Sequence, residues 1–472
     1  MKAKLYLWHR RLALLVLVPL LLFGLSGLLH PVMRLTAPET AQHFYPQPQW
    51  PDNLPSIETL IDESQLTTVA GLRPVQIDQN WYIQSWENRS EPSQFLTLNA
   101  KPAQEIELAY AEQLARHYSG ENTAGIKQIR LISEFSHQYP AINRLLPVWE
   151  VMFERDDNLS VFVDIRQDRL ATITDDSRRL FMTMFHFLHV WAFIDQENPL
   201  RTALFISMML ISTFIGISGL YLFAVLPLKQ RKNAQLKKIH AWIGVGISAA
   251  LLMFVFSGMV RTIEKLEPEI RGVPLDQSLV LSDISFGLAQ IQAQYPNSSN
   301  TQLHELEGRA VWQLQQPRQP SLWLDAQSGE QLPEGPFDFA KQLVSNTQGQ
   351  QPEVIDQRLI NSFKEDHNYG FIDKRLPVVA IDYADKTYYV DTRDAVLSVK
   401  VDNADKVYSW IFSYLHKWHF ADGLGRDVRD GIISLFILAI SGTSLLGFYT
   451  WLKARRKRKQ AYKQRSRCAE VA

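Results

Sequence analysis

The sequence predicts an α-helical membrane protein, with four transmembrane helices that come from an internal duplication and two α+β domains outside the membrane. Three observations support this fold class. Four stretches of the 472-residue chain contain no Asp, Glu, Lys or Arg, and each is about as long as the ~20 residues that a helix needs to cross a bilayer. Basic residues gather beside these stretches on one side only. A histidine-bearing element occurs twice, 227 residues apart.

The charge-free stretches predict where the helices cross the membrane. They are Leu12–Met33, Thr202–Leu228, His240–Val260 and Gly431–Leu452. Pro19 lies inside the first and predicts a kink, because proline removes a backbone donor and clashes with the preceding turn. A basic start followed by an apolar run is also typical of a cleaved signal peptide. This run exceeds the usual ~7–15 residues, so we expect an uncleaved anchor.

Basic clusters predict the orientation in the membrane, because Lys and Arg accumulate in short cytoplasmic loops. They precede the first span, fill the loop between the second and third, and follow the fourth. Both termini are therefore expected in the cytoplasm and both long polar regions in the periplasm, with the chain in a bacterial inner membrane. The expected segments are a cytoplasmic N-terminus with the first span at 1–33, a periplasmic domain at 34–184, a histidine segment with the second span at 185–228, a cytoplasmic loop at 229–239, the third span at 240–261, a second periplasmic domain at 262–406, a histidine segment with the fourth span at 407–452, and a basic cytoplasmic tail at 453–472.

Composition excludes several classes of function. The formal net charge is zero, which argues against a nucleic-acid partner. Cys468 is the single cysteine, so disulfides, an iron–sulfur cluster held by thiolates and covalent haem attachment are all excluded. The chain contains no G-x-S-x-G, H-E-x-x-H, Walker or G-x-G-x-x-G motif. A redox centre in this chain would have to use histidine.

Two pairs of histidines occupy matched positions. FHFLHVWAF at 185–193 aligns with SYLHKWHF at 413–420, which places His189 on His416. His9 and His240 each lie 18 residues before a glycine, Gly27 and Gly258. Low-spin haem takes two axial imidazoles from facing helices. We therefore expect two haem b groups, one held by His9 and His240 near the cytoplasm and one by His189 and His416 near the periplasm.

Other histidines and several arginines remain open. Histidines near helix ends can also be interfacial hydrogen-bonding groups within an aromatic belt. The spacing of His186 with His189 and of His416 with His419 also suits zinc. The matched positions are Ser413 and Ala192, and neither segment has a carboxylate or cysteine beside it, which favours haem. His30, His186 and His419 are second-choice ligands, and the candidates for haem propionate contacts are Arg10, Arg11, Arg201 and Arg426, each of which could instead contact lipid or cap a helix.

The two polar regions carry matched strand patterns. β-Branched and aromatic runs bounded by Asp and Asn turns predict antiparallel meanders. Segment 135–148 aligns with 365–378, which places His137 on His367 and Tyr139 on Tyr369. These four residues are candidates for contacting a substrate, although such residues can equally hold a β-domain together. The expected helices are 57–66, 106–118 and 286–296, and the expected strands are 74–77, 81–86, 94–98, 148–153, 160–165, 169–173, 310–316, 378–383, 387–392 and 395–399.

A helix followed by a hairpin, in FGLAQIQAQYP, AVWQLQQ and SLWLDAQSGEQL at 286–332, resembles a PepSY domain. Together with WHRR, IHAWIG and the repeated LH-x-W-x-F, it makes residues 1–455 resemble the PepSY-associated transmembrane family. The resemblance implies an inner-membrane haem protein that reduces a ferric siderophore in the periplasm. A separate cytoplasmic donor or a quinol would supply the electrons. The alternative is a haem-free sensor or chaperone whose PepSY-like domains bind a periplasmic protein or peptide.

Overall fold

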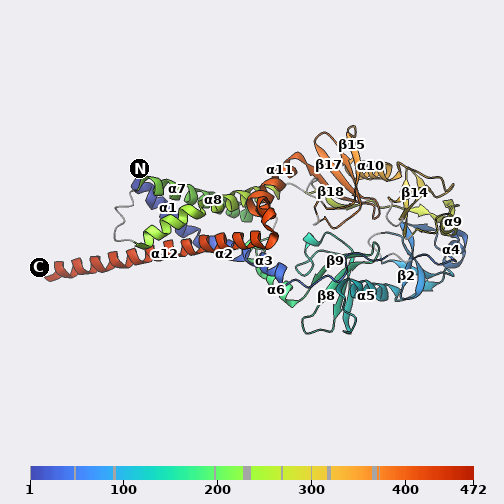
Figure 1. Cartoon of the computed structure of the whole chain (residues 1–472), viewed down its shortest axis with the longest axis horizontal. Coiled ribbons are helices and arrows are strands. Elements are labelled where there is room, and N and C mark those ends of the chain that lie inside the picture. The colour runs from blue at the N-terminus through green and yellow to red at the C-terminus, as the bar shows by residue number, and fades with distance from the viewer. Residues whose placement is uncertain are drawn as a thin grey trace. The chain divides into compact units, whose positions relative to one another are not determined.

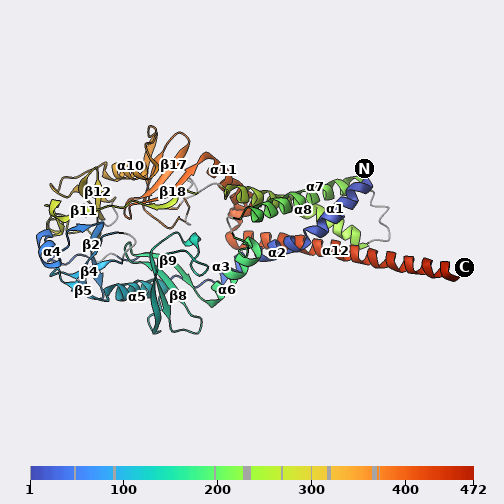
Figure 2. The same cartoon turned by 180° about the vertical axis from the view of Figure 1, so that it is seen from behind.

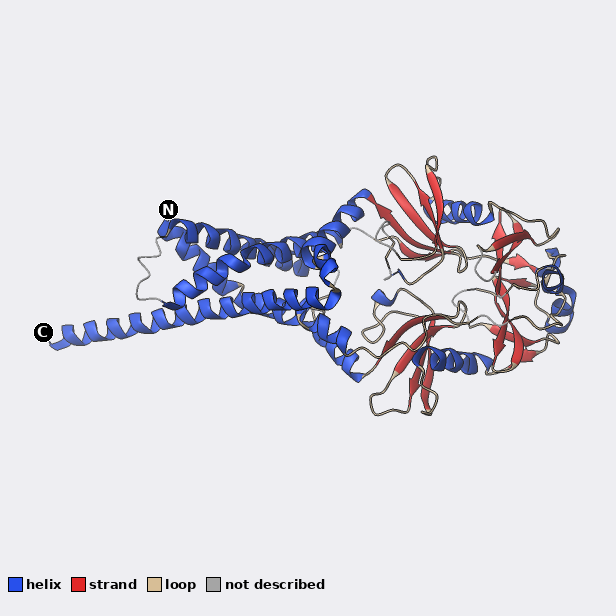
Figure 3. Ribbon diagram, viewed as in Figure 1, coloured by secondary structure: helices blue, strands red, loops and turns tan. Residues whose placement is uncertain are grey.

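The structure is a computed structural model, and it falls into two compact units (Figures 1 and 3). The first unit contains Met1–Thr36, Leu180–Pro268 and Ala404–Ala472, and the second contains Ala37–Arg179 and Glu269–Asn403. All of the strands lie in the second unit. The structure describes residues 2–46, 49–88, 92–195, 198–226, 235–266, 269–298, 300–315, 320–363, 369–370 and 373–471.

Among the described residues of the first unit, four helices are long and apolar enough to span a membrane, which confirms the four predicted spans. They cover Leu17–Leu35, Pro199–Val225, Gln235–Glu264 and Arg426–Tyr462. Local sequence explains the start of the second, where the Asn198 side chain accepts a hydrogen bond from the Leu200 backbone N–H and Pro199 takes the first turn. The elements are α1 (Lys2–Leu15), α2 (Leu17–Gly27), α3 (Leu29–Leu35), α7 (Pro199–Val225), α8 (Gln235–Glu264) and α12 (Arg426–Val471).

The first span is interrupted between α1 and α2. Val16 has φ −95° and ψ 5°, outside the helical region. Pro19 lies three residues later and has no N–H to donate to the carbonyl of Leu15, where α1 ends. The predicted kink is therefore present, and it changes the neighbours of the span, because α1 packs against α7 whereas α2 packs against α12.

The bundle closes through contacts of α7 with α8 and of α8 with α12. The beginnings of α1 and α8 and the end of α7 form the end that we call the terminal end, from which α12 continues towards the C-terminus (Figures 1 and 2). We call the opposite end, where the chain passes to the second unit, the linker end. It holds α6 (Asp176–Phe185), α11 (Asn403–Ile411) and two single-turn π-helices, His186–Val190 and Phe412–His416.

The second unit contains four antiparallel sheets of three to five strands, with strand orders β2-β3-β4-β5, β6-β7-β8-β9, β12-β13-β14 and β10-β18-β17-β16-β15. A short pair, β1 with β11, joins the two halves of the unit, and one core contains Leu72 from the first half and Leu303 from the second. The strands are β1 (Thr68–Val69), β2 (Gly71–Ile77), β3 (Asn80–Trp86), β4 (Gln94–Thr97), β5 (Pro102–Ala103), β6 (Ile126–Ile132), β7 (Val148–Phe153), β8 (Ser160–Asp164), β9 (Arg169–Thr174), β10 (Arg271–Pro274), β11 (Leu279–Val280), β12 (Asn300–Leu306), β13 (Arg309–Gln315), β14 (Leu322–Asp325), β15 (Asp356–Ile360), β16 (Val378–Asp382), β17 (Lys386–Asp391) and β18 (Val396–Asp402).

Helices cover these sheets. In one core, α5 packs Leu114 against Val151 and Val161, and in another α10 packs Leu343 against Val379 and Val390. The combination of apolar helices and α+β sheets confirms the coarse fold prediction. The patterns did not predict α10, β6, β12 or β15. The helices here are α4 (Ile57–Ser64), α5 (Ile106–Ser119), α9 (Leu288–Gln294) and α10 (Gly335–Gln348).

Candidate functional site

The first histidine of the linker end is fixed by a serine from the first span. Nδ1 of His189 lies 3.0 Å from Oγ of Ser26. The Ser26 hydroxyl has one hydrogen, and it is directed to the backbone carbonyls of Leu22 (2.5 Å) and Phe23 (3.1 Å). Its oxygen therefore accepts a hydrogen bond from Nδ1–H of His189. This assigns the neutral tautomer in which Nε2 carries the lone pair.

The second histidine of the linker end repeats this arrangement. Nδ1 of His416 lies 3.1 Å from Oγ of Ser257, whose hydroxyl donates to the Met253 carbonyl at 2.7 Å. His416 therefore has the same assigned tautomer as His189. Each histidine belongs to one of the two π-helices. Such single π-turns are frequent at functional sites.

Matched aromatic contacts surround the two rings. Phe185 stacks on His189 and Phe412 on His416, each with 4.7 Å between ring centroids. Trp191 and Trp418 follow the π-helices with φ of 54° and 55°, a conformation that is unfavourable for a bulky side chain. Each indole N–H donates at 3.1 Å to the carbonyl three residues earlier. Each indole ring also stacks on a phenylalanine, Phe23 or Phe254, which stabilises the strained turn.

Two further histidines lie towards the terminal end. Nδ1 of His9 lies 2.9 Å from Oγ of Ser218, whose hydroxyl donates to the Ile215 carbonyl at 3.2 Å. Nδ1 of His240 lies 3.1 Å from the carbonyl of Thr443. A carbonyl can only accept, so Nδ1 of His240 carries the hydrogen, and the same assignment follows for His9.

Glycines give both rings room. A Cβ added to Gly219 of α7 would lie 3.3 Å from Cε1 of His9, and one added to Gly447 of α12 would lie 3.0 Å from Cε1 of His240. The neighbouring helices can therefore approach these imidazoles closely only because they have no side chain there.

The structure brings the predicted histidines together in pairs. His9 lies within electrostatic range of His240, and His416 within range of His189. His9 and Ser26 are 17 residues apart on the first span, so the two pairs are separated by about 25 Å along a helix that rises ~1.5 Å per residue. The four imidazoles thus form two layers.

The second-choice histidines have other surroundings. His30 is exposed, and its ring centroid lies 6.4 Å from that of Phe185. His186 belongs to the first π-helix. Nδ1 of His419 lies 2.6 Å from an Asp422 carboxylate oxygen. Among the described residues no group of three or more His, Cys, Asp or Glu is arranged to hold a metal ion, so the zinc alternative gains no support.

The four arginines predicted to contact propionates differ in exposure. Arg201 is buried, and its guanidinium donates to the Val190 carbonyl at 3.0 and 2.6 Å, so it caps the first π-helix. Arg426 and Arg11 are exposed, and Arg10 is half-buried. Helix capping, one of the predicted alternatives, thus describes Arg201.

The substrate candidates in the second unit are only partly placed at a surface. Tyr139 and Tyr369 are buried, and their hydroxyls donate to the carbonyls of Leu145 and Arg375 at 2.8 and 2.9 Å. Their side chains therefore belong to the β-domain cores and present no surface to a substrate, which corrects their assignment as substrate contacts. His137 is exposed, and His367 lies outside the described residues.

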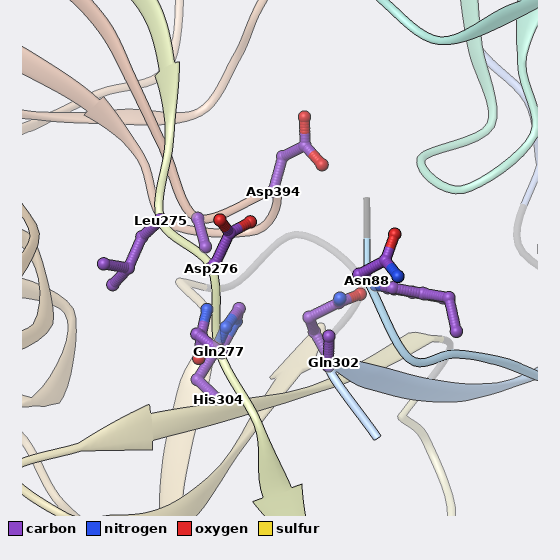
Figure 4. A pocket seen from close by; sticks show the side chains of 10 residues that line it. Asn88, Leu275, Asp276, Gln277, Gln302, His304 and Asp394 are labelled. Carbon is purple, nitrogen blue, oxygen red and sulfur yellow. The ribbon is translucent and has the colours of Figure 1, made fainter. Parts of the chain in front are cut away.

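Two hollows occur in the second unit. One is a cavity of about 30 Å³ lined by residues that include Asn88, Asp276 and Gln302 (Figure 4). It is large enough for little more than a water molecule. The other is a groove of about 460 Å³ along β4, β5 and the start of α5, and its lining includes Glu105 and Glu107. Burial raises the pKa of Glu107.

A family model described as the PepSY-associated TM region matches residues 7–454, nearly the whole chain. The chain belongs to the PepSY-associated transmembrane family. This confirms the resemblance seen in the sequence motifs. A comparison with curated proteins finds no match.

Sequence reasoning missed several residues of this PepSY-associated transmembrane protein that hold the histidines. Ser26 and Ser257 were noticed as repeated positions but not as hydrogen-bond partners. Phe23 and Phe254 recur at the same offset of 231 residues as the serines, so the repeat itself carried the signal. Gly447 has no such signal, because its role depends on where α8 meets α12.

Proposed function

We propose that the protein is a di-haem b reductase of the bacterial inner membrane that passes electrons to a periplasmic ferric chelate, with a ferric siderophore as its substrate. The observation that supports this most is the repeated Nδ1 hydrogen bond of His189 to Ser26 and of His416 to Ser257. A histidine that ligates iron through Nε2 characteristically donates its other N–H to such a partner.

The residues fit the group. Each layer supplies two neutral imidazoles whose Nδ1 atoms are held, the donor set of a low-spin bis-histidine haem. When bound, haem supplies one-electron transfer. The serine hydroxyls and the Thr443 carbonyl orient the rings. The stacked phenylalanines exclude water from the linker-end pair, and Gly219 and Gly447 keep the terminal-end rings close to their neighbouring helices.

The direction of electron flow follows from charge. Lys2, Lys4, Lys237 and Lys238 lie at the terminal end, which the positive-inside rule assigns to the cytoplasm. A cytoplasmic donor or a quinol would then reduce the His9 and His240 layer, and the acceptor would be reduced beyond the His189 and His416 layer. Reduction releases iron, because hard oxygen ligands hold Fe(II) less tightly than Fe(III).

A second candidate is a haem-free sensor or chaperone that binds a periplasmic peptide. The groove beside β5 favours it, because β5 is the edge strand of its sheet and an extended peptide can add to such an edge. This candidate requires no histidine layer, so an optical measurement separates the two.

The test is the visible spectrum of the purified chain. We expect a sharp Soret band that shifts on reduction with dithionite, and two haems per chain in a pyridine haemochromogen assay. Replacing His189 and His416 by alanine should remove one haem, whereas His43→Ala, at an exposed position of the second unit, should remove none. A purified protein without a Soret band would rule out the reductase and leave the sensor.

A further inference from the structure

Positive charge gathers around one of the two linker-end histidines. The Lys417 ammonium lies 5.2 Å and the Arg261 guanidinium 5.7 Å from the ring centroid of Phe412. Phe412 in turn stacks on His416 at 4.7 Å. Two cations are thus attached to the aromatic ring that supports His416.

These charges are not balanced by carboxylates. Lys417 lies within electrostatic range of Arg261, Arg426 and Arg429, which are all positive. Arg261 pairs with Glu264, and Arg429 pairs with Asp422 and Asp430. Within the described part of the chain, Lys417 and Arg426 form no ion pair. Like charges this close repel, so an anion bound between them would be favoured.

The cluster occurs beside one histidine of the pair only. At the offsets that align the two halves, Val190 corresponds to Lys417, and His30 corresponds to Arg261. His30 contacts Phe185 as Arg261 contacts Phe412, so the two positions match in space as well as in sequence. The packing around the histidines is repeated without these cations, so the packing does not require them.

We propose that Lys417, Arg426 and Arg261 form a binding site for an anionic ferric chelate at the linker end, beside His416. The inference rests on the proposed function and adds the charge class of its acceptor. The bound chelate takes one electron from the proposed donor chain, its Fe(III) becoming Fe(II), and no covalent bond forms or breaks. Chelates with carboxylate or catecholate groups carry the required negative charge, whereas neutral tris-hydroxamates do not.

Exposure favours an acceptor over an anion that belongs to the protein's own cofactor or to lipid. Lys417 and Arg426 are both exposed, so a dissolved chelate can reach them. The groove along β4 and β5 has glutamates in its lining, which would repel the same anion. The linker-end cluster is therefore the better match in charge.

The experiment measures how fast two acceptors reoxidise the dithionite-reduced full-length protein. The anionic probe is ferric EDTA, and the neutral probe is iron(III) tris(acetohydroxamate). We expect Lys417→Gln with Arg426→Gln to slow ferric EDTA about threefold to tenfold and to reduce the salt dependence of its rate, because charge steering is lost. The neutral probe should keep its rate. Lys417→Arg keeps the charge, and Lys453→Gln removes an exposed charge elsewhere on α12, so both should behave as the wild type.

Each remaining outcome contradicts the proposal. Equal slowing of both acceptors together with a shifted Soret band or midpoint potential would assign the cations to a haem propionate. Unchanged rates with both probes would assign them to lipid headgroups. Binding of redox-inert gallium(III) EDTA, followed by calorimetry, separates the site from the reductase function. Lys417-dependent binding to a protein without haem would keep the site and reject the function, whereas haem reduction without such binding would do the reverse.

Discussion

The hydroxyl groups of Ser26 and Ser257 are the smallest features on which the proposed cofactor sites depend. Each accepts the Nδ1–H of a histidine. Removing such a partner usually weakens metal binding about 10-fold to 100-fold, because the ligand ring is no longer oriented. We expect Ser26→Ala or Ser257→Ala to weaken haem retention at the linker end on that scale, measured by haem loss to apomyoglobin.

The matched control is Ser248→Ala. Ser248 is also buried in α8, and its hydroxyl donates to the Gly244 carbonyl. Its loss should leave haem release unchanged. Wild-type haem retention in both Ser26→Ala and Ser257→Ala would show that the two histidines are not ligands.

Lys374 in the second unit makes a prediction about pH. Its ammonium donates to the Asn143 side chain at 3.2 Å and to the Ala171 carbonyl. Burial, with Arg178 and Arg144 nearby, lowers the pKa of Lys374 from 10.5 to about 7. Between these values the unfolded chain binds more protons than the folded one, so the contribution of Lys374 to stability rises as the pH rises from 7 towards 10.

The measurement is the thermal midpoint of wild type minus that of Lys374→Met, followed by tryptophan fluorescence of the full chain at several pH values. We expect this difference to become more positive from pH 6.5 to pH 9. Lys127→Met, at an exposed lysine of the same unit, should give a flat difference. A flat profile for Lys374→Met would mean that Lys374 stays protonated in the folded chain.

At the scale of elements, the two π-helices determine where His189 and His416 point. A π-turn contains one residue more than the α-helical turn it replaces, so deleting a residue should restore ordinary helical hydrogen bonding and rotate the histidine away from its serine. We expect deletion of the exposed Phe187 to abolish one haem while the protein still folds and retains the other. Phe187→Ala, which keeps the π-turn, should retain both haems.

Deleting the exposed Tyr414 from the second π-helix tests the pairing independently. If His189 and His416 share one haem, this deletion should remove the same haem as deletion of Phe187, and the double deletion should remove no more. Loss of two haems in the double deletion would show that the two histidines serve different groups.

The sequence predicts elements whose pattern is local, and it fails where the cause lies far along the chain. Charge-free runs locate the four spans, and alternation locates β7, β8 and β17. The π-helices escape prediction because periodicity does not distinguish a π-turn from an α-turn, and their histidines are held by serines 163 and 159 residues away. The positive φ of Trp191 is unexpected because the stacking on Phe23 that stabilises it is a tertiary contact.

At the scale of the whole molecule, buried charges join the two halves of the second unit. Nη1 of Arg169 in β9 lies 2.6 Å from a carboxylate oxygen of Asp391 in β17, and that carboxylate lies 3.3 Å from Arg375. Burial alone would raise the pKa of Asp391, but Arg169 and Arg375 hold it below its usual value. The carboxylate is therefore charged near neutral pH, and its stabilising contribution is lost only as the pH falls through that lowered pKa.

Removing one partner of a buried pair costs about 3–5 kcal/mol, because the other charge stays buried without compensation, whereas removing both costs less than the sum. We expect Arg169→Met to lower the thermal midpoint strongly and to separate the unfolding of the second unit into two transitions, because β9 and β17 belong to different halves. Arg169→Met with Asp391→Leu should recover part of the loss. Arg155→Met, which removes an ion pair at the surface, should change the midpoint little. Additive losses in the double variant would mean that the two halves are held together by the apolar core that contains Leu72 and Leu303, and that the charges contribute little to their association.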